Sequence, residues 1–116
     1  MEHIRIQAIS HFDNMRGMFE EFYNSKTMVD VVLVVEGKHY PAHRLVLSIG
    51  SDYFRRVFTD LQDDDTTPTI IITDDISCKD IESVIEFLYR GQVILQQEHV
   101  ASFRRAADKL GIKGFH

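Results

Sequence analysis

Much of what would anchor or cross-link a chain is missing from this sequence. It contains a single cysteine, Cys78, which excludes an internal disulfide framework and is typical of an intracellular protein. No apolar run approaches the ~20 residues that span a bilayer, so we expect no contact with a membrane. Residues 1–5 lack the basic, apolar and small-residue order of a secretory signal. The sequence therefore predicts a soluble intracellular protein.

Positive charge is also scarce. The chain has 13 Lys and Arg residues against 18 Asp and Glu residues, a net charge of −5. Binding to nucleic acid depends on clustered Lys and Arg side chains. The two basic pairs, Arg55-Arg56 and Arg104-Arg105, lie beside the apolar stripes of predicted helices, where solvent-facing positions explain them. We predict no direct contact with nucleic acid.

Motifs of catalysis and metal binding are absent as well. The segment 48–51 lacks the first glycine of a hydrolase nucleophile elbow, and no glycine-rich phosphate loop is present. His39 and His43 are four residues apart, but Pro41 lies between them, so they cannot share a helical face. The acidic run 63–65 lacks the alternating ligands and the glycine of a calcium loop. We predict that the protein is not an enzyme and holds no metal and no cofactor.

What the chain does contain is a series of short strands and amphipathic helices, over 116 residues that suffice for one domain. The predicted elements are a weak strand at 4–9, a helix at 11–24, strands on either side of Gly37, helices at 43–51 and 52–61, a strand at 69–73, a helix from Ser77 to Gly91 and a helix at 96–109. This order predicts a single α+β domain over 1–116, with its core in 29–115 and a dominant helical layer.

The helix at 11–24 carries a stripe of large apolar side chains at three- and four-residue intervals. The stripe consists of Phe12, Met15, Met18, Phe19, Phe22 and Tyr23. One interpretation is that it belongs to the core of the chain. The other is that it packs on the same helix of a second copy, while the alternating Ile4 and Ile6 add a strand to the partner's sheet edge. We predict the second arrangement, with Ile4, Ile6, Phe12, Met15, Met18, Phe19 and Phe22 in a homodimer interface.

Two charged residues, Asp30 and Arg44, stand at the ends of apolar elements. An unpaired charge buried there would cost several kcal/mol. The two side chains could pair with each other in a charged pocket between the first strand and the first core helix. The alternative is that both are exposed at the ends of their elements.

Several short segments together resemble the signature of the BTB/POZ domain family. They are Val29-Asp30-Val31, 42–48, 51–54 with Phe58, Phe87-Leu88-Tyr89-Arg90-Gly91 and 106–110. The resemblance implies the BTB/POZ fold, a small mixed sheet of short strands flanked by a cluster of helices. It also implies a domain that joins protein chains, typically as a strand-exchanged homodimer, and that does no chemistry.

Within that family the chain is most similar to the tramtrack group of insect transcription factors. The similarity rests on Val35-Glu36-Gly37, 87–93, Gln97-Glu98 and 110–115. It implies a nuclear protein that regulates transcription or chromatin through self-association, with other BTB proteins or transcriptional cofactors as further partners. Members of the group typically open with Phe-x-Leu-Arg-Trp-Asn, which is linked to assembly beyond the dimer. Here residues 4–9 lack both aromatics, so we favour a dimer.

A second function, also known among BTB proteins, is the substrate-adaptor domain of a cullin-type ubiquitin ligase. Such adaptors resemble one another in a hydrophobic-x-Glu motif after the second core helix. The nearest match here is Leu61-Gln62-Asp63, with a shorter acid. The predicted function is therefore homodimerisation, with the adaptor role as the alternative.

Overall fold

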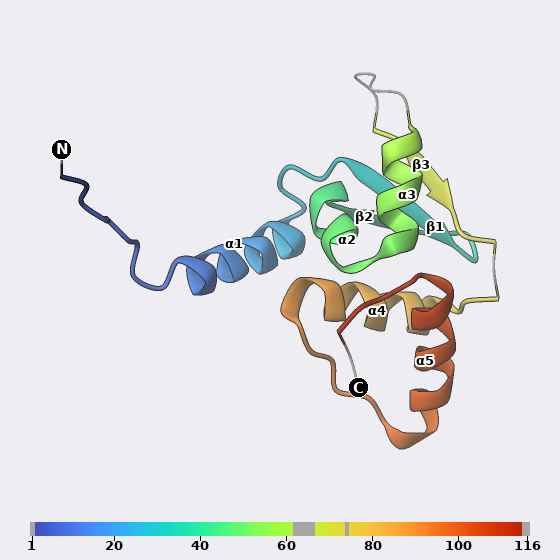
Figure 1. Ribbon diagram of the computed structural model, residues 1–116. Helices are drawn as coiled ribbons and strands as arrows, with labels where there is room; N and C mark the ends of the chain where they lie inside the picture. Colours follow the sequence, from blue (N-terminus) through green and yellow to red (C-terminus); the bar gives the residue numbers. More distant parts are fainter. Residues whose placement is uncertain (1, 62–66, 74, 115–116) are drawn as a thin grey trace.

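The computed structural model describes residues 2–61, 67–73 and 75–114, and it contains a small sheet with helices packed against it (Figure 1). In chain order the elements are α1 (His11–Ser25), β1 (Val31–Val35), β2 (Lys38–Ala42), α2 (Arg44–Gly50), α3 (Asp52–Asp60), β3 (Thr69–Ile71), α4 (Cys78–Arg90), the 3-10 helix η1 (Gln97–His99) and α5 (Val100–Lys109). The predicted α+β organisation is confirmed.

The sheet has the strand order β2-β1-β3, with β1 and β2 antiparallel and β1 and β3 parallel. Glu36 and Gly37 join the hairpin, and both have a positive φ, 50° and 79°. This conformation matches a tight two-residue turn, whose twist fits that of the flanking strands. Alternate residues of β1, namely Val31, Leu33 and Val35, are fully buried.

Strand β3 is shorter than the predicted strand at 69–73. Its register pairs Val34 with Ile71, and the N–H of Ile72 donates one further hydrogen bond to the carbonyl of Val34 at 2.9 Å. Because β1 ends at Val35 and turns away, no backbone remains opposite Thr73.

Ser51 caps the start of α3, and the same side chain ties two distant parts of the chain together. The hydroxyl of Ser51, a buried side chain, accepts a hydrogen bond from the N–H of Phe54 at 3.1 Å. The same hydroxyl donates to the carbonyl of Leu110 at 2.6 Å. The beginning of α3 is therefore fixed to the end of α5.

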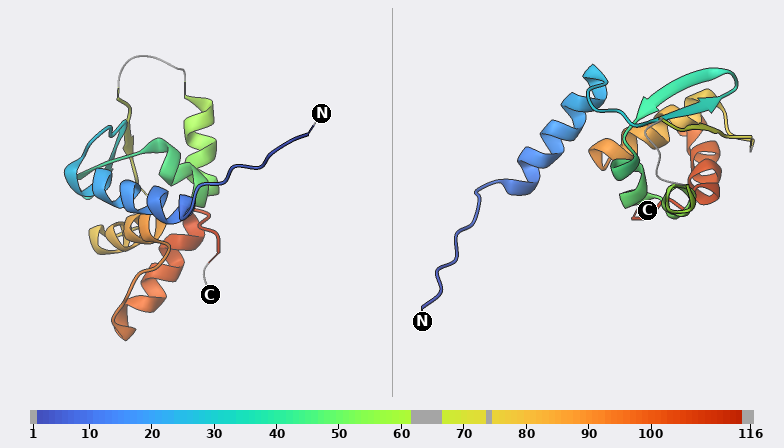
Figure 2. Two further views of the ribbon diagram at one scale, coloured as in Figure 1. Left: turned by 90° about the vertical axis from the view of Figure 1, so that its left-hand side faces the viewer. Right: turned by 90° about the horizontal axis from the view of Figure 1, so that it is seen from above.

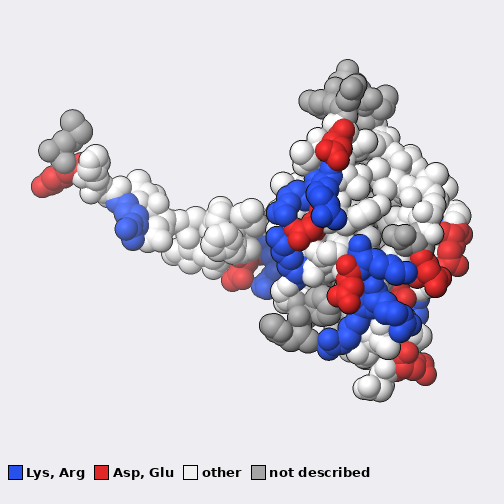
Figure 3. Space-filling view, turned by 45° about the vertical axis from the view of Figure 1, so that its right-hand side comes forward, with Lys and Arg blue, Asp and Glu red and all other residues white. Residues whose placement is uncertain are grey.

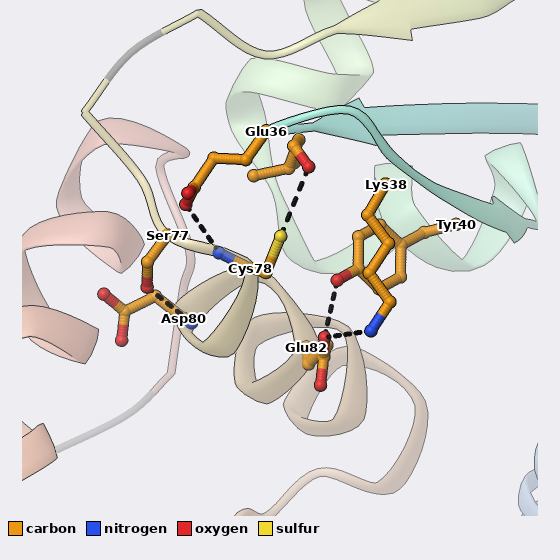
Figure 4. Close-up of polar contacts among 8 residues, drawn as sticks. Glu36, Lys38, Tyr40, Ser77, Cys78, Asp80 and Glu82 are labelled. Carbon is orange, nitrogen blue, oxygen red and sulfur yellow. Dashed lines mark hydrogen bonds and ion pairs between the residues drawn. The ribbon is translucent and has the colours of Figure 1, made fainter.

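Helix α4 begins and ends where the sequence predicts. The hydroxyl of Ser77 accepts from the N–H of Asp80 at 3.1 Å, and Gly91 ends the helix with a φ of 78°. Figure 4 shows how the hairpin turn meets this helix, since the Glu36 carboxylate accepts from the N–H of Cys78 at 3.0 Å. The inward residues Ile81, Val84, Ile85 and Tyr89 are buried.

The last predicted helix, 96–109, is divided in the structure. Its first turn is the 3-10 helix η1, in which the N–H of His99 donates to the carbonyl of Gln96 at 2.9 Å, and α5 starts only at Val100. Such tight turns are common at helix ends. The inward residues Phe103, Ala106, Ala107 and Leu110 are buried, while Val100 is half-buried.

Helix α1 and residues 2–9 project away from the rest of the molecule (Figures 1 and 2). The radius of gyration is 16.2 Å, whereas a compact chain of this length has about 13 Å. No residue of α1 is buried, and the core consists of residues from β1 to the end of α5. Among the described residues, no helix has the length and the apolar character needed to cross a bilayer.

Candidate interaction surface

The apolar stripe of α1 is divided between the chain's own core and solvent. Phe19 and Tyr23 are half-buried and pack against the core. Phe12 is 80% exposed and Met18 is 43% exposed. The C-terminal half of the stripe contacts α4, as the first interpretation predicts, while its N-terminal half is exposed in the single chain. Its packing on a second copy stays a prediction.

Two side-chain contacts hold α1 on α4. The ring of Tyr23 lies against that of Tyr89, with 4.4 Å between the centroids. The guanidinium of Arg90 forms an ion pair with Glu20 at 3.0 Å. These contacts fix the direction in which the bare half of α1 points.

A third contact fixes the segment that follows α1. The ring of His43 lies between this segment and α4, with Nε2 2.7 Å from the carbonyl of Thr27 and Nδ1 2.5 Å from the hydroxyl of Tyr89. The backbone N–H of His43 donates to the same hydroxyl at 2.9 Å. Because this oxygen already accepts that bond, it can donate its own proton to Nδ1, which leaves Nε2–H to donate to Thr27.

Residues 2–9 form no strand within the single chain. Ile4, Ile6 and Ile9 are among its most exposed side chains, and Ile6 is 91% exposed. A strand needs a neighbour to complete its hydrogen bonds. The predicted strand at 4–9 and its exchange between two copies therefore stay predictions.

Some apolar residues outside the predicted interface are also exposed. Leu45 and Ile49, 64% and 65% exposed, are four residues apart on the outer face of α2, while Val46 and Leu47 are buried. The four-residue spacing of Leu45 and Ile49 is a signal of an outer face, whereas the predicted core, 29–115, includes this helix. Ile94 is 94% exposed in segment 92–96, which lies outside the helices and strands.

Asp30 and Arg44 are paired. Nε of Arg44 lies 3.1 Å from Oδ2 of Asp30, and the backbone N–H of Arg44 donates to Oδ1 at 2.7 Å. Their side chains are 44% and 36% exposed. Because both charges remain in contact with water, the free-energy cost of burying an unpaired charge is small here. The carboxylate also caps α2, whose N-cap residue His43 makes no side-chain cap. That the pair forms a binding pocket stays a prediction.

Replacing Asp30 with Ala should lower the free energy of unfolding by about 1–2 kcal/mol, the range for loss of a helix cap. Urea denaturation followed by circular dichroism at fixed protein concentration measures this change. Asp108→Ala removes an exposed acid from α5 as the control and should change the free energy by less than about 0.5 kcal/mol. Equal unfolding midpoints for Asp30→Ala and the unmutated chain would show that the cap contributes nothing.

The surface offers apolar area and ion pairs. In the described parts of the chain, no three His, Cys, Asp or Glu side chains are arranged to hold a metal ion. The Cys78 thiol is half-buried and donates to the carbonyl of Val35 at 3.2 Å. Two residues of the cullin-adaptor motif, Gln62 and Asp63, lie outside the described residues.

A small mixed sheet with helices packed against it, preceded by an exposed apolar arm, defines an α+β domain. A BTB/POZ domain profile matches residues 19–116, and the chain belongs to this family. BTB/POZ domains are protein–protein interaction modules. The predicted family and fold class are confirmed.

Three curated relatives from Drosophila melanogaster illustrate the similarity. The chain is 37% identical to "Protein tramtrack, alpha isoform" over 105 residues, which cover 90% of this chain and 12% of that protein. It is 36% identical to "Longitudinals lacking protein-like" over 101 residues, 87% of this chain and 77% of that one. It is 35% identical to "Protein bric-a-brac 2" over 101 residues, 87% of this chain and 9% of that protein. The chain thus spans a small part of the first and third relatives and most of the second.

Proposed function

We propose that the domain is a self-association module that forms a homodimer through α1. The observation that carries this proposal is the bare apolar surface on the N-terminal half of that helix. Fully burying a Met or Phe side chain stabilises by about 1.5–3 kcal/mol relative to full exposure. In a twofold dimer both copies bury the same side chain, so the gain is made twice. Packing of Phe12, Met15 and Met18 against their counterparts is the simplest way to remove this surface from water.

The exposed segment 2–9 supports the exchange of a strand between the two copies. Ile4 and Ile6 point to one side of an extended chain, since successive side chains of a strand alternate. The segment 92–96 lies outside the helices and strands and exposes Ile94, so it offers a backbone against which a second copy's residues 4–9 can pair. The exchange would extend the contact beyond α1 through backbone hydrogen bonds.

The exposed face of α2 supplies a further part of the proposed interface. Leu45 and Ile49 are 64% and 65% exposed, and a contact with a second copy would remove this apolar surface from water. Covering them together with α1 would give one continuous interface. Because α2 also carries the buried core residues Val46 and Leu47, a contact there couples dimerisation to the stability of the core.

We further propose that the homodimer serves a nuclear regulator of transcription or chromatin. The similarity to tramtrack and bric-a-brac 2 supports this role, and so does the absence of any reaction chemistry in the sequence pattern. Other BTB proteins and transcriptional cofactors are candidate partners through the same surfaces. With a net charge of −5, the domain contributes association and no direct contact with nucleic acid.

Multi-angle light scattering at micromolar concentration tests the proposal. A mass twice that of the 116-residue chain is expected. A folded monomer under these conditions would overturn the dimer, and a mass of four or more chains would show that assembly continues past it. Capture of a cullin N-terminal domain at micromolar affinity would favour the adaptor function instead.

A further inference from the structure

A groove between α1, β2 and α4 includes Tyr23 of the apolar stripe but lies apart from the exposed stripe residues Phe12, Met15 and Met18. It encloses about 360 Å³, and we call it the tyrosine groove because three tyrosines contribute to its walls. Its lining residues are Glu20, Tyr23, Asn24, Tyr40, Glu82, Glu86, Tyr89 and Arg90. An α-helix turns by about 100° per residue, which places Glu20 and Asn24 on the flank of α1 opposite Met15 and Met18. The groove therefore stays open when the stripe is covered.

The walls of the tyrosine groove are held in place by hydrogen bonds. The hydroxyl of Tyr40 donates to Glu82 at 2.5 Å, and the ammonium of Lys38 lies 3.4 Å from the same carboxylate (Figure 4). The hydroxyl of Tyr89 is held by the backbone N–H and the ring of His43. Tyr40 and Tyr89 are buried side chains, so the groove needs little rearrangement to receive a ligand.

The charge that lines the groove is negative. Of the three lining carboxylates, those of Glu20 and Glu86 pair with Arg90 and that of Glu82 pairs with Lys38, so three negative charges face two positive ones. Burial raises the pKa of the Tyr23 hydroxyl, and the charges of Glu82 and Glu86 raise it further. The field of these carboxylates therefore reaches the aromatic wall. A positively charged guest would be attracted here.

The tyrosine rings around the groove already attract ammonium groups of the chain itself. Nζ of Lys26 lies 3.8 Å from the centroid of the Tyr23 ring. Nζ of Lys38 lies 5.7 Å from that of Tyr40. The faces of aromatic rings favour cations at such distances, more strongly where water is excluded. The structure thus contains its own examples of the contact that a guest ammonium would make.

Other parts of the described surface are less specific. Figure 3 shows Lys and Arg side chains gathered on one face, with Asp and Glu side chains among them. Of the described basic residues, Arg55 and Lys113 are both paired with Asp52. Such a patch attracts anions in general and does not distinguish one anionic ligand from another. The tyrosine groove combines shape, aromatic walls and charge in one place.

We propose that the tyrosine groove binds a lysine side chain presented by a basic segment of a protein partner. The four methylenes of lysine can lie along the tyrosine rings, and the ammonium can reach the carboxylates of Glu82 and Glu86. The groove lies on the far flank of α1 from the dimer stripe, so one domain can hold a second copy and a basic partner at once.

NMR titration of the ¹⁵N-labelled domain tests this site. The probe is a capped peptide with one lysine among glycines and serines, and the control is the same peptide with norleucine, which keeps the methylenes and lacks the charge. We expect the lysine peptide to shift resonances of Tyr23, Glu86 and Tyr89 and to bind roughly tenfold or more tightly than the norleucine peptide. Equal binding of the two peptides would overturn the proposal.

Variants separate the site from general charge attraction. Glu86→Gln removes a lining carboxylate while keeping its shape and should weaken lysine-peptide binding roughly fivefold or more. Glu21→Gln makes the same change one residue from Glu20, outside the groove, and should leave binding within about twofold. Tyr23→Leu removes one aromatic face of the groove and should also weaken lysine-peptide binding. If this variant loosens the packing of α1 on α4, the test of the site rests on Glu86→Gln. Equal effects of Glu86→Gln and Glu21→Gln, or spermine binding as tightly as the peptide, would show charge attraction only and contradict the proposal.

Discussion

Replacing Met18 with Asp should convert the dimer into a monomer. Met18 is 43% exposed in the single chain and lies in the stripe proposed to meet its counterpart. A carboxylate at this position would be buried in the interface without a partner, which costs free energy. Both copies incur this cost, because a twofold interface uses the same residue in each. We expect a dimer dissociation constant raised roughly 100-fold or more, measured by sedimentation equilibrium.

A matched variant on the same helix separates the contact from general charge. Asn24→Asp adds the same charge on the opposite, exposed flank of α1 and should leave the dissociation constant within about threefold. Both variants should keep the circular dichroism of the unmutated domain. A dimer of undiminished affinity in Met18→Asp would contradict the assignment of the stripe. Phe19→Asp is a poorer probe, because Phe19 also packs against the chain's own core.

Removing residues 2–9 should weaken the dimer by roughly tenfold or more. The proposed exchange provides several backbone hydrogen bonds to the partner, each contributing about 0.5–1.5 kcal/mol net, in addition to the burial of Ile4 and Ile6. Concentration-dependent light scattering measures the change. The fold of the remaining chain should persist, because these isoleucines are exposed in the single chain.

A second variant tests whether the loss comes from strand pairing or from apolar contact. Replacing Ile4 and Ile6 by Thr keeps the preference for a strand while removing most of the apolar area. We expect this variant to lie between the unmutated and shortened chains. An unchanged dissociation constant in the shortened chain would show that residues 2–9 play no part in assembly.

The elements that the sequence predicts well have their signals within a few residues. The hairpin turn needs a positive φ at Gly37, and α4 is bounded by the cap at Ser77 and by Gly91. Each signal acts through the local backbone, so no knowledge of distant neighbours is needed. The resemblance to BTB/POZ domains predicts how these elements are arranged in the fold.

The candidate site was less predictable because its residues depend on distant neighbours. Phe19 and Met18 belong to the same apolar stripe, yet only Phe19 is packed against the core. Periodicity identifies an apolar face but does not show what covers it. The pairing of Asp30 and Arg44 was left open for the same reason, since 14 residues separate them. The tyrosine groove brings together residues of α1, β2 and α4, which no sequence spacing connects.

The most direct test of the central claim is an isotope-filtered nuclear Overhauser experiment on a mixed dimer. One copy carries ¹³C in its methionine methyl groups and the other copy is unlabelled. We predict intermolecular contacts from the methyls of Met15 and Met18 to methyl and aromatic protons of the partner's α1. A dimer that shows no such contacts while others appear elsewhere would mean that α1 is not the interface.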